Sequence, residues 1–177
     1  MTRESLKEWI AYIFIVVVIS FCIVTFVGQR TVVDGDSMND TLQNGDNLIV
    51  DKLSYRFINI DRFDIVVFRN HDEKNNFYIK RVIGLPGETI QITGDDIYIN
   101  GELLEEDYGK EAMDSPGCAA EPITLGADEY FVLGDNRNCS KDSRDAEHVG
   151  NVKRDWIVGR AFARITPFSE ACVLLNQ

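Results

Sequence analysis

The amino-acid sequence predicts a mainly β protein, in which an N-terminal single transmembrane helix precedes a partly closed antiparallel β domain. The first observation is a run of eighteen residues without a charge, at 10–27. The second is a series of short segments that are rich in β-branched and aromatic residues and bounded by Gly, Asn, Asp or Pro. The third is that no long helical periodicity follows residue 30.

The composition favours a folded, acidic protein with one modest domain. The chain has 177 residues, of which 45% are hydrophobic and 27% are charged. These values are ordinary for globular proteins. The 18 Lys+Arg and 29 Asp+Glu residues give a net charge of -11. Because a negative surface repels polyphosphates, nucleic acid is disfavoured as a partner.

The uncharged run at 10–27 predicts a membrane anchor. Eighteen helical residues extend about 27 Å, close to the roughly 30 Å hydrocarbon core of a bilayer. A buried core helix would normally carry a polar stripe, and a cleavable signal would end at a small-x-small site, which residues 28–31 lack. Both alternatives are less favoured but stay open. Arg3 and Lys7 favour a cytoplasmic leader at 1–9 and an extracytoplasmic domain at 28–177.

The rest of the chain reads as strands and turns. The Asn100-Gly101 pair within 97–103 is typical of a tight β-hairpin. The polar stretch from Gly101 to Gly126 predicts a long excursion from the sheet. The expected strands are 47–51, 64–69, 77–84, 89–93, 96–100 and 129–134.

The cysteines permit a disulfide but do not fix one. Cys22 falls in the predicted anchor, and Cys118, Cys139 and Cys172 follow it. Cys118 and Cys139 are the plausible pair outside the membrane, yet three cysteines leave one over and the pairing stays open. The two histidines, His71 and His148, and the lack of a Cys-x-x-Cys motif give a metal site little support. No metal or other cofactor is expected.

Ser37 is the first candidate for chemistry. A serine in such a segment often serves only as a helix cap or turn residue. Here Gly35 and Asp36 can form a tight turn that exposes the hydroxyl group, while Met38 and Leu42 supply an apolar flank. The segment therefore suggests a nucleophile without proving one.

Lys80 is the candidate base. In a strand at 77–84, Tyr78 and Lys80 share one face and Ile79 and Arg81 share the other. A surface lysine on an edge strand is the common alternative. Burial, in contrast, can lower a lysine pKa by 3–5 units from about 10.4, which leaves a neutral amine near pH 7–8. Since both histidines fall in polar surroundings, a Ser-Lys pair is favoured over a Ser-His-Asp triad.

The third segment, 130–145, is an apolar strand that ends abruptly in a charged loop. Such a loop on a rigid scaffold is typical of functional sites, although a solvated turn is the plain alternative. The three segments, in this order behind an anchor, resemble the bacterial type I signal peptidases. The matching residues are Gly35-Asp36-Ser37-Met38 with Thr41-Leu42, Lys80-Arg81-Val82-Ile83-Gly84 with Pro86-Gly87, Gly134-Asp135-Asn136-Arg137 with Ser140, Asp142, Ser143 and Arg144, and Val158-Gly159-Arg160-Ala161.

The resemblance implies a membrane-anchored endopeptidase that removes N-terminal signal peptides from exported preproteins at the outer face of the cell membrane. Ser37 matches the nucleophile, whose own N–H would contribute to the oxyanion hole, and Lys80 matches the general base. Ser140 matches the hydroxyl that orients the lysine amine. Asp142 and Arg144 match residues that brace the site.

The substrate cleft is expected to be apolar and shallow, with Met38, Ile79 and Leu133 in its wall. An extended peptide points alternate side chains the same way, so two small pockets would select small residues one and three positions before the cut. The expected partners are secretory preproteins and membrane lipid.

Two departures and two rival functions accompany this resemblance. Asp40 replaces a usual proline, and Asn138-Cys139 replaces the more common Asp-Asn. A carboxylate at position 40, if close to Lys80, would favour the protonated amine. The rivals are a self-cleaving repressor protease, which the anchor and the acidic charge disfavour, and a catalytically weak or silent membrane-tethered peptide-binding β module.

Overall fold

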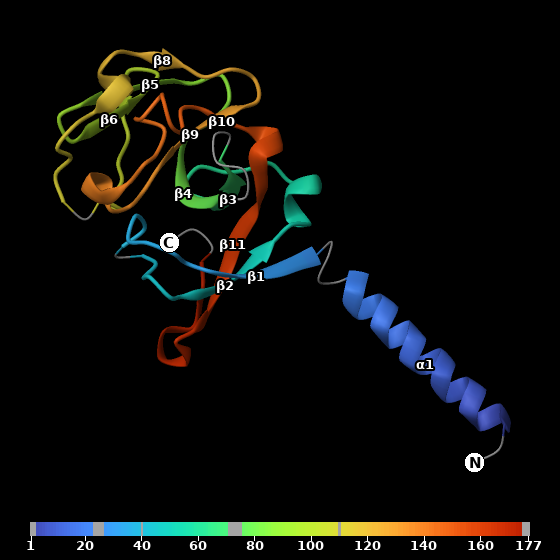
Figure 1. Ribbon diagram of the computed structural model, residues 1–177. Coiled ribbons are helices and arrows are strands. Elements are labelled where there is room, and N and C mark those ends of the chain that lie inside the picture. Colours follow the sequence, from blue (N-terminus) through green and yellow to red (C-terminus); the bar gives the residue numbers. More distant parts are fainter. Residues whose placement is uncertain (1–2, 23–26, 40, 71–75, 110, 175–177) are drawn as a thin grey trace.

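The computed structural model describes residues 3–22, 27–39, 41–70, 76–109 and 111–174. Helix α1 (Arg3–Cys22) lies apart from the β sheets (Figure 1). Its apolar side chains from Trp9 to Phe21 are exposed. Among the described residues, no helix meets the length and hydropathy expected of a membrane span. Part of the predicted anchor, 23–26, lies outside those residues.

The larger sheet is antiparallel and carries Lys80 in one of its strands, while Ser37 lies in the connection between two of them. Its strand order is β1-β2-β11-β3-β4-β9-β10, with β12 paired to β11. The strands are β1 (Gly28–Val32), β2 (Asn47–Asp51), β3 (Ile65–Arg69), β4 (Phe77–Gly84), β9 (Glu129–Leu133), β10 (Val152–Lys153), β11 (Ile157–Thr166) and β12 (Cys172–Val173).

The smaller sheet is also antiparallel and lies at the end of the molecule away from α1 (Figure 1). Its order is β7-β6-β5-β8, from β5 (Thr89–Thr93), β6 (Asp96–Ile99), β7 (Glu102–Leu103) and β8 (Ile123–Thr124). Short 3-10 helices complete the described secondary structure: Ser54–Arg56, Gly117–Ala120, Arg137–Cys139, Arg154–Trp156 and Phe168–Glu170.

The core explains why β4 and β9 are apolar along most of their length. Val82 and Val132 pack into one cluster of buried side chains, whereas their neighbours Ile83 and Leu133 pack into a second cluster together with the smaller sheet. Both strands are therefore covered on both faces, and their burial does not alternate. A third cluster, which includes Met38, Leu42 and Leu48, lies beneath the Ser37 segment.

The mainly β, antiparallel prediction is confirmed. All six predicted strands are present, and the Asn100-Gly101 turn joins β6 to β7 with positive φ at both residues. The predicted partial closure is not seen, because the pairings of the described strands leave both sheets open. Cys118, Cys139 and Cys172 are free, so the Cys118–Cys139 bridge is not formed.

Candidate active site

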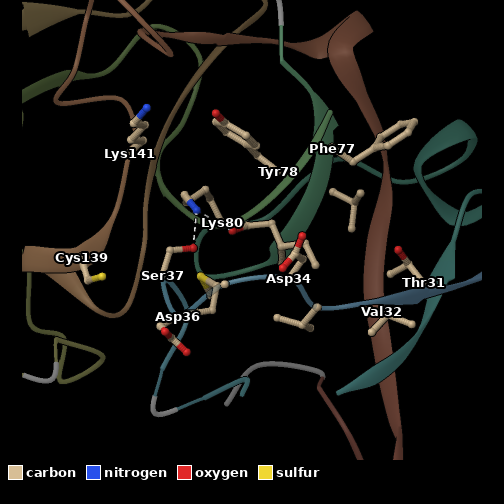
Figure 2. A pocket seen from close by; sticks show the side chains of 15 residues that line it. Thr31, Val32, Asp34, Asp36, Ser37, Phe77, Tyr78, Lys80, Cys139 and Lys141 are labelled. Carbon is tan, nitrogen blue, oxygen red and sulfur yellow. Dashed lines mark hydrogen bonds between the residues drawn. The ribbon is translucent and has the colours of Figure 1, made fainter. Parts of the chain in front are cut away.

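Ser37 lies in a tight turn between β1 and β2. Gly35 has φ +98°, a left-handed conformation that side chains other than glycine rarely adopt, and it reverses the chain just before the serine. The N–H of Leu42 donates to the Met38 carbonyl at 2.8 Å, which closes a helical turn. Met38 and Leu42 are buried beneath it. These two apolar anchors leave the Ser37 side chain half-buried at the surface of the cavity in Figure 2.

Lys80 reaches Ser37 from β4. Its side chain is only 4% exposed, and Nζ lies 2.6 Å from Ser37 Oγ and 3.0 Å from the Ile79 carbonyl oxygen (Figure 2). Burial lowers the pKa of Lys80 to about 8, although the carboxylates of Asp142 and Asp135 act in the opposite direction. A substantial neutral fraction can therefore exist just above neutral pH, and a neutral amine can accept a proton from a hydroxyl group.

Asp142 and Arg144 brace the loop that follows β9, which we call the catalytic loop (residues 134–144). The guanidinium of Arg144 donates to both oxygens of Asp142 at 2.9 Å. The second oxygen also accepts from the N–H of Gly134 at 3.1 Å. Bidentate arginine–carboxylate pairs fix orientation as well as distance. The loop thus holds the Asp142 charge in a defined place near Lys80.

Arg81 and Asp135 form a second buried pair on the other face of β4. Both side chains are 1% exposed, with Arg81 Nη2 and Asp135 Oδ2 2.7 Å apart. Thr41 donates its hydroxyl hydrogen to the same Asp135 oxygen at 2.5 Å. Asn136, the next residue, donates backbone and side-chain N–H groups to the carbonyls of Ser37 and Asp36. The catalytic loop is thereby joined to the Ser37 turn.

The sequence motif contained Thr41, Asp135 and Asn136, but the prediction gave them no role. The signal that could have identified Asp135 was Arg81 itself, which needs a buried carboxylate as its partner. An arginine in a strand covered on both faces requires a nearby carboxylate, because an unpaired buried charge is very costly.

Ser140 does not occupy the predicted position. Its Oγ is buried and makes no hydrogen bond with any described residue, so it does not orient the Lys80 amine here. The hydroxyl instead packs against Gly134, where a Cβ would fall closer than 3.0 Å to Ser140 Oγ and to the Ser37 carbonyl oxygen. The Lys80 amine is oriented by Ser37 and the Ile79 carbonyl oxygen.

A cavity of about 400 Å³ opens beside Ser37 and Lys80. Met38 and Ile79 line it, but Leu133 does not: its side chain is 0% exposed and belongs to the core beneath the smaller sheet. Leu133 is therefore corrected from a cleft residue to a core residue. The full lining is Thr31, Val32, Val33, Asp34, Gly35, Asp36, Ser37, Met38, Val67, Phe77, Tyr78, Ile79, Lys80, Cys139 and Lys141.

Of the two departures from the family pattern, one lies in the cavity and the other lies outside the described residues. Cys139 lines the cavity as an exposed free thiol (Figure 2). Asp40, whose charge was expected to affect Lys80 if close, lies outside the described residues. The N–H of Ser37 donates to no backbone carbonyl among the described residues.

A sequence model of the family described as signal peptidase, peptidase S26, matches residues 6–166. The chain is 42% identical over 171 residues to a signal peptidase I of Leptolyngbya laminosa, with 93% of this chain and 81% of that protein covered. It is 39% identical over 166 residues to a probable signal peptidase I-2 of Synechocystis sp., with 91% and 73% covered.

A crystal structure of a signal peptidase I from Enterococcus faecalis is 35% identical and aligns with a TM-score of 0.47, covering 58% of this chain and 97% of that one. The family match extends across the Ser37 turn, β4 and the catalytic loop. The chain therefore belongs to the signal peptidase family, peptidase S26, whose type I members are serine endopeptidases.

Proposed function

We propose that the chain removes signal peptides from exported preproteins, with Ser37 as nucleophile and Lys80 as general base. The observation that carries this proposal is the 2.6 Å separation of Ser37 Oγ and Lys80 Nζ, with the lysine almost completely buried. Buried lysines can lose their proton near neutral pH, and a base within hydrogen-bond reach can activate a serine.

The reaction proceeds in two steps. Neutral Lys80 accepts the Ser37 hydroxyl proton as Oγ bonds to the scissile carbonyl carbon, and the carbonyl electron pair moves to oxygen. The N–H of Ser37 stabilises this oxyanion. The intermediate collapses with loss of the amine, which takes the proton from the Lys80 ammonium. Lys80 then accepts a proton from the attacking water as the water oxygen bonds to the ester carbon, and it returns that proton to Ser37 Oγ as the C–Oγ bond breaks and the acid product leaves.

Asp142 and Arg144 act as positioning residues. The negative charge of Asp142 raises the pKa of Lys80 and so stabilises the ammonium that forms during each step. Arg144 holds the Asp142 carboxylate in place. Ser140 supports the loop by packing on Gly134 and is not assigned a hydrogen bond to the base.

Residues 10–27 act as a membrane anchor, behind a cytoplasmic leader at 1–9 and ahead of an extracytoplasmic catalytic domain at 28–177. The apolar side chains of α1 that are exposed on all sides support this role, because lipid is the environment in which such a surface is stable. Anchoring also confines enzyme and preprotein to one membrane and raises their effective concentration.

Cleavage of a preprotein with an Ala-x-Ala site, measured with the full-length protein in detergent, tests the proposal. Ser37→Ala and Lys80→Ala should each abolish cleavage while melting cooperatively like wild type. Ser169→Ala and Lys153→Ala are matched controls on exposed residues and should cleave normally.

Cleavage by Ser37→Ala at the wild-type rate would contradict the assignment of the nucleophile. A folded wild-type protein that binds but does not cleave the preprotein would support the alternative, a silent peptide-binding module. A truncated protein starting near Arg30 should cut membrane-bound precursors more slowly than the full chain, because it loses the shared membrane.

A further inference from the structure

Residues 104–118, described except for residue 110, leave the smaller sheet after β7 and run along the catalytic loop before returning to β8. We call this segment the strap. Its first residues alternate in exposure: Leu104, Glu106 and Tyr108 are partly buried, whereas Glu105 and Asp107 are exposed. This two-residue period presents one face of an extended segment to the protein. Leu104 packs on the core cluster of the smaller sheet.

Glu106 contacts the catalytic loop through Arg137. A carboxylate oxygen of Glu106 lies 2.8 Å from Arg137 Nη2, and the two side chains are 8% and 3% exposed. Arg137 Nε in turn donates to the Gly134 carbonyl at 3.1 Å. Gly109 lies against the same guanidinium, since a Cβ there would be 3.5 Å from Arg137 Cζ. The strap therefore covers Arg137, whose side chain is hydrogen-bonded to Gly134 at the start of the catalytic loop.

Tyr108 contacts the strand that carries the base. The guanidinium carbon of Arg81 lies 3.6 Å from the centroid of the Tyr108 ring, and Phe63 contacts the ring at 5.1 Å between centroids. Arg81 follows Lys80 in β4 and pairs with Asp135 of the catalytic loop. A guanidinium confined between an aromatic face and a carboxylate has few alternative positions.

The rest of the strap holds the far end of the loop. The Asn138 side chain donates to the Ala112 carbonyl at 2.8 Å and accepts from the Asp114 N–H at 2.9 Å. Arg144, which fixes Asp142, donates to the Ser115 carbonyl at 3.2 Å. The loop is thus bonded to the strap along most of its length.

We propose that the strap positions the catalytic loop over Lys80, and that Glu106 and Tyr108 are positioning residues for the Ser37–Lys80 reaction. This inference rests on the proposed function. Two series of contacts connect the strap to the catalytic loop. Glu106 binds Arg137, which binds Gly134. Tyr108 packs on Arg81, which pairs with Asp135. Gly134 and Asp135 are the residues that precede Asn136, whose N–H groups bind the Ser37 turn.

A loosened loop should change the environment of the base in a defined direction. The charged groups that face Lys80 are Asp135 and Asp142, and Asp34, Asp36 and Lys141 line the same cavity. Water admitted beside Lys80 would solvate its ammonium and raise its pKa. Activity would then fall most at neutral pH and recover as the pH rises. A melting curve at each pH separates this effect from partial unfolding, which lowers the folded fraction but leaves the pH midpoint of the folded protein unchanged.

The test compares Glu106→Gln and Tyr108→Ala with the controls Glu105→Gln and Tyr108→Phe in full-length protein. The substrate is an Ala-x-Ala preprotein in detergent, followed between about pH 6 and about pH 10. We expect kcat at pH 7 to fall roughly tenfold or more in both test variants, with KM within about twofold and the midpoint of the pH profile shifted upward. Tyr108→Phe keeps the ring over Arg81 and should behave like wild type, as should Glu105→Gln.

An unchanged midpoint in a folded Glu106→Gln protein would overturn the role of Glu106. Equal loss in Tyr108→Phe and Tyr108→Ala would overturn the role of the Tyr108 ring. If Tyr108→Ala fails to melt cooperatively, the isosteric Glu106→Gln carries the test. Ser37→Ala in the same assay keeps the two proposals separate, because cleavage by that variant contradicts the nucleophile and not the strap.

Discussion

The carbonyl oxygen of Ser37 accepts a hydrogen bond from the backbone N–H of Asn136 at 3.1 Å. The side chain of Asn136 donates to the neighbouring carbonyl of Asp36, also at 3.1 Å, across a separation of 100 residues. The Ser37 turn is therefore fixed from behind by the loop that carries Asp142. A displacement of that loop would move Ser37 relative to Lys80, and a misplacement of about 1 Å can cost on the order of 100-fold in rate.

Gly134→Ala should abolish most cleavage. A Cβ at this position would fall closer than 3.0 Å to Ser140 Oγ and to the Ser37 carbonyl oxygen, and the second of these is backbone that cannot move aside cheaply. The measurement is the cleavage rate of an Ala-x-Ala preprotein together with the melting temperature. Gly28→Ala is the control, because its Cβ would meet the Val50 carbonyl oxygen at an ordinary 3.6 Å. Normal cleavage by Gly134→Ala would show that the loop has room to move.

The pH dependence of cleavage should follow Lys80. Because a base must be neutral, kcat/KM should rise through the Lys80 pKa of about 8 and fall at lower pH, where the amine is protonated. Lys80→Arg should be as inactive as Lys80→Ala, since a guanidinium stays protonated up to a pH of about 12. Near-normal cleavage by Lys80→Arg would mean that another group is the base.

The buried Lys80 ammonium should also lower the free energy of unfolding at neutral pH. Its pKa is lower in the folded protein than in the unfolded chain, so below about pH 8 both states are protonated and the full cost of the buried ammonium is present. Between about pH 8 and pH 10.4 the unfolded chain holds more protons, so stability rises with pH, by an amount on the order of 3 kcal/mol in total.

Lys80→Met removes this titration while keeping the volume nearly constant. The variant should be more stable than wild type at pH 7, and the difference should shrink between about pH 8 and pH 10.4. Urea unfolding of the two proteins across this range measures it. A difference that does not vary with pH would contradict the lowered pKa.

Substrate choice should depend on the size of two side chains before the cut. The cavity beside Ser37 is lined by Met38 and Ile79, and a bulky residue there would displace the scissile carbonyl from Ser37 Oγ. Ala-x-Ala sites should be cut, and Leu at either position should reduce the rate about 100-fold. The comparison uses purified full-length protein and matched preproteins. Equal rates for Ala-x-Ala and Leu-x-Leu sites would contradict the prediction.

The sequence was most informative where the local pattern determines the structure. β4 and β5 begin and end at the predicted residues, because each is a β-branched run between turn residues. The Asn100-Gly101 turn has positive φ at both positions, as its composition predicts. In contrast, β1 has little apolar character, and only its pairing with β2 defines it.

The candidate site shows the same division. The sequence predicts the pairing of Ser37 and Lys80, because their motifs occur together in one family. Leu133 was placed in the cleft wrongly, since alternation along β9 does not reveal that the smaller sheet covers that face. The hydroxyl of Ser140 packs on Gly134 and does not make the predicted hydrogen bond to Lys80, which depends on distances that a sequence does not contain.

β4 carries two cationic residues in succession, and the strand register determines which of them lies beside Ser37. Lys80 pairs with Val66 and Arg81 with Ile65 of β3, five consecutive pairs fix this alignment, and an irregularity between Val82 and Gly84 follows on the β9 side. A slip by one residue would exchange the two faces of the strand. The permanently charged guanidinium would then lie against the serine, and the amine against the buried carboxylate. The cation that meets Ser37 is therefore determined by strand alignment as much as by the residue itself, and a folded chain with a slipped β4 would place beside Ser37 a guanidinium, which cannot act as the proposed base.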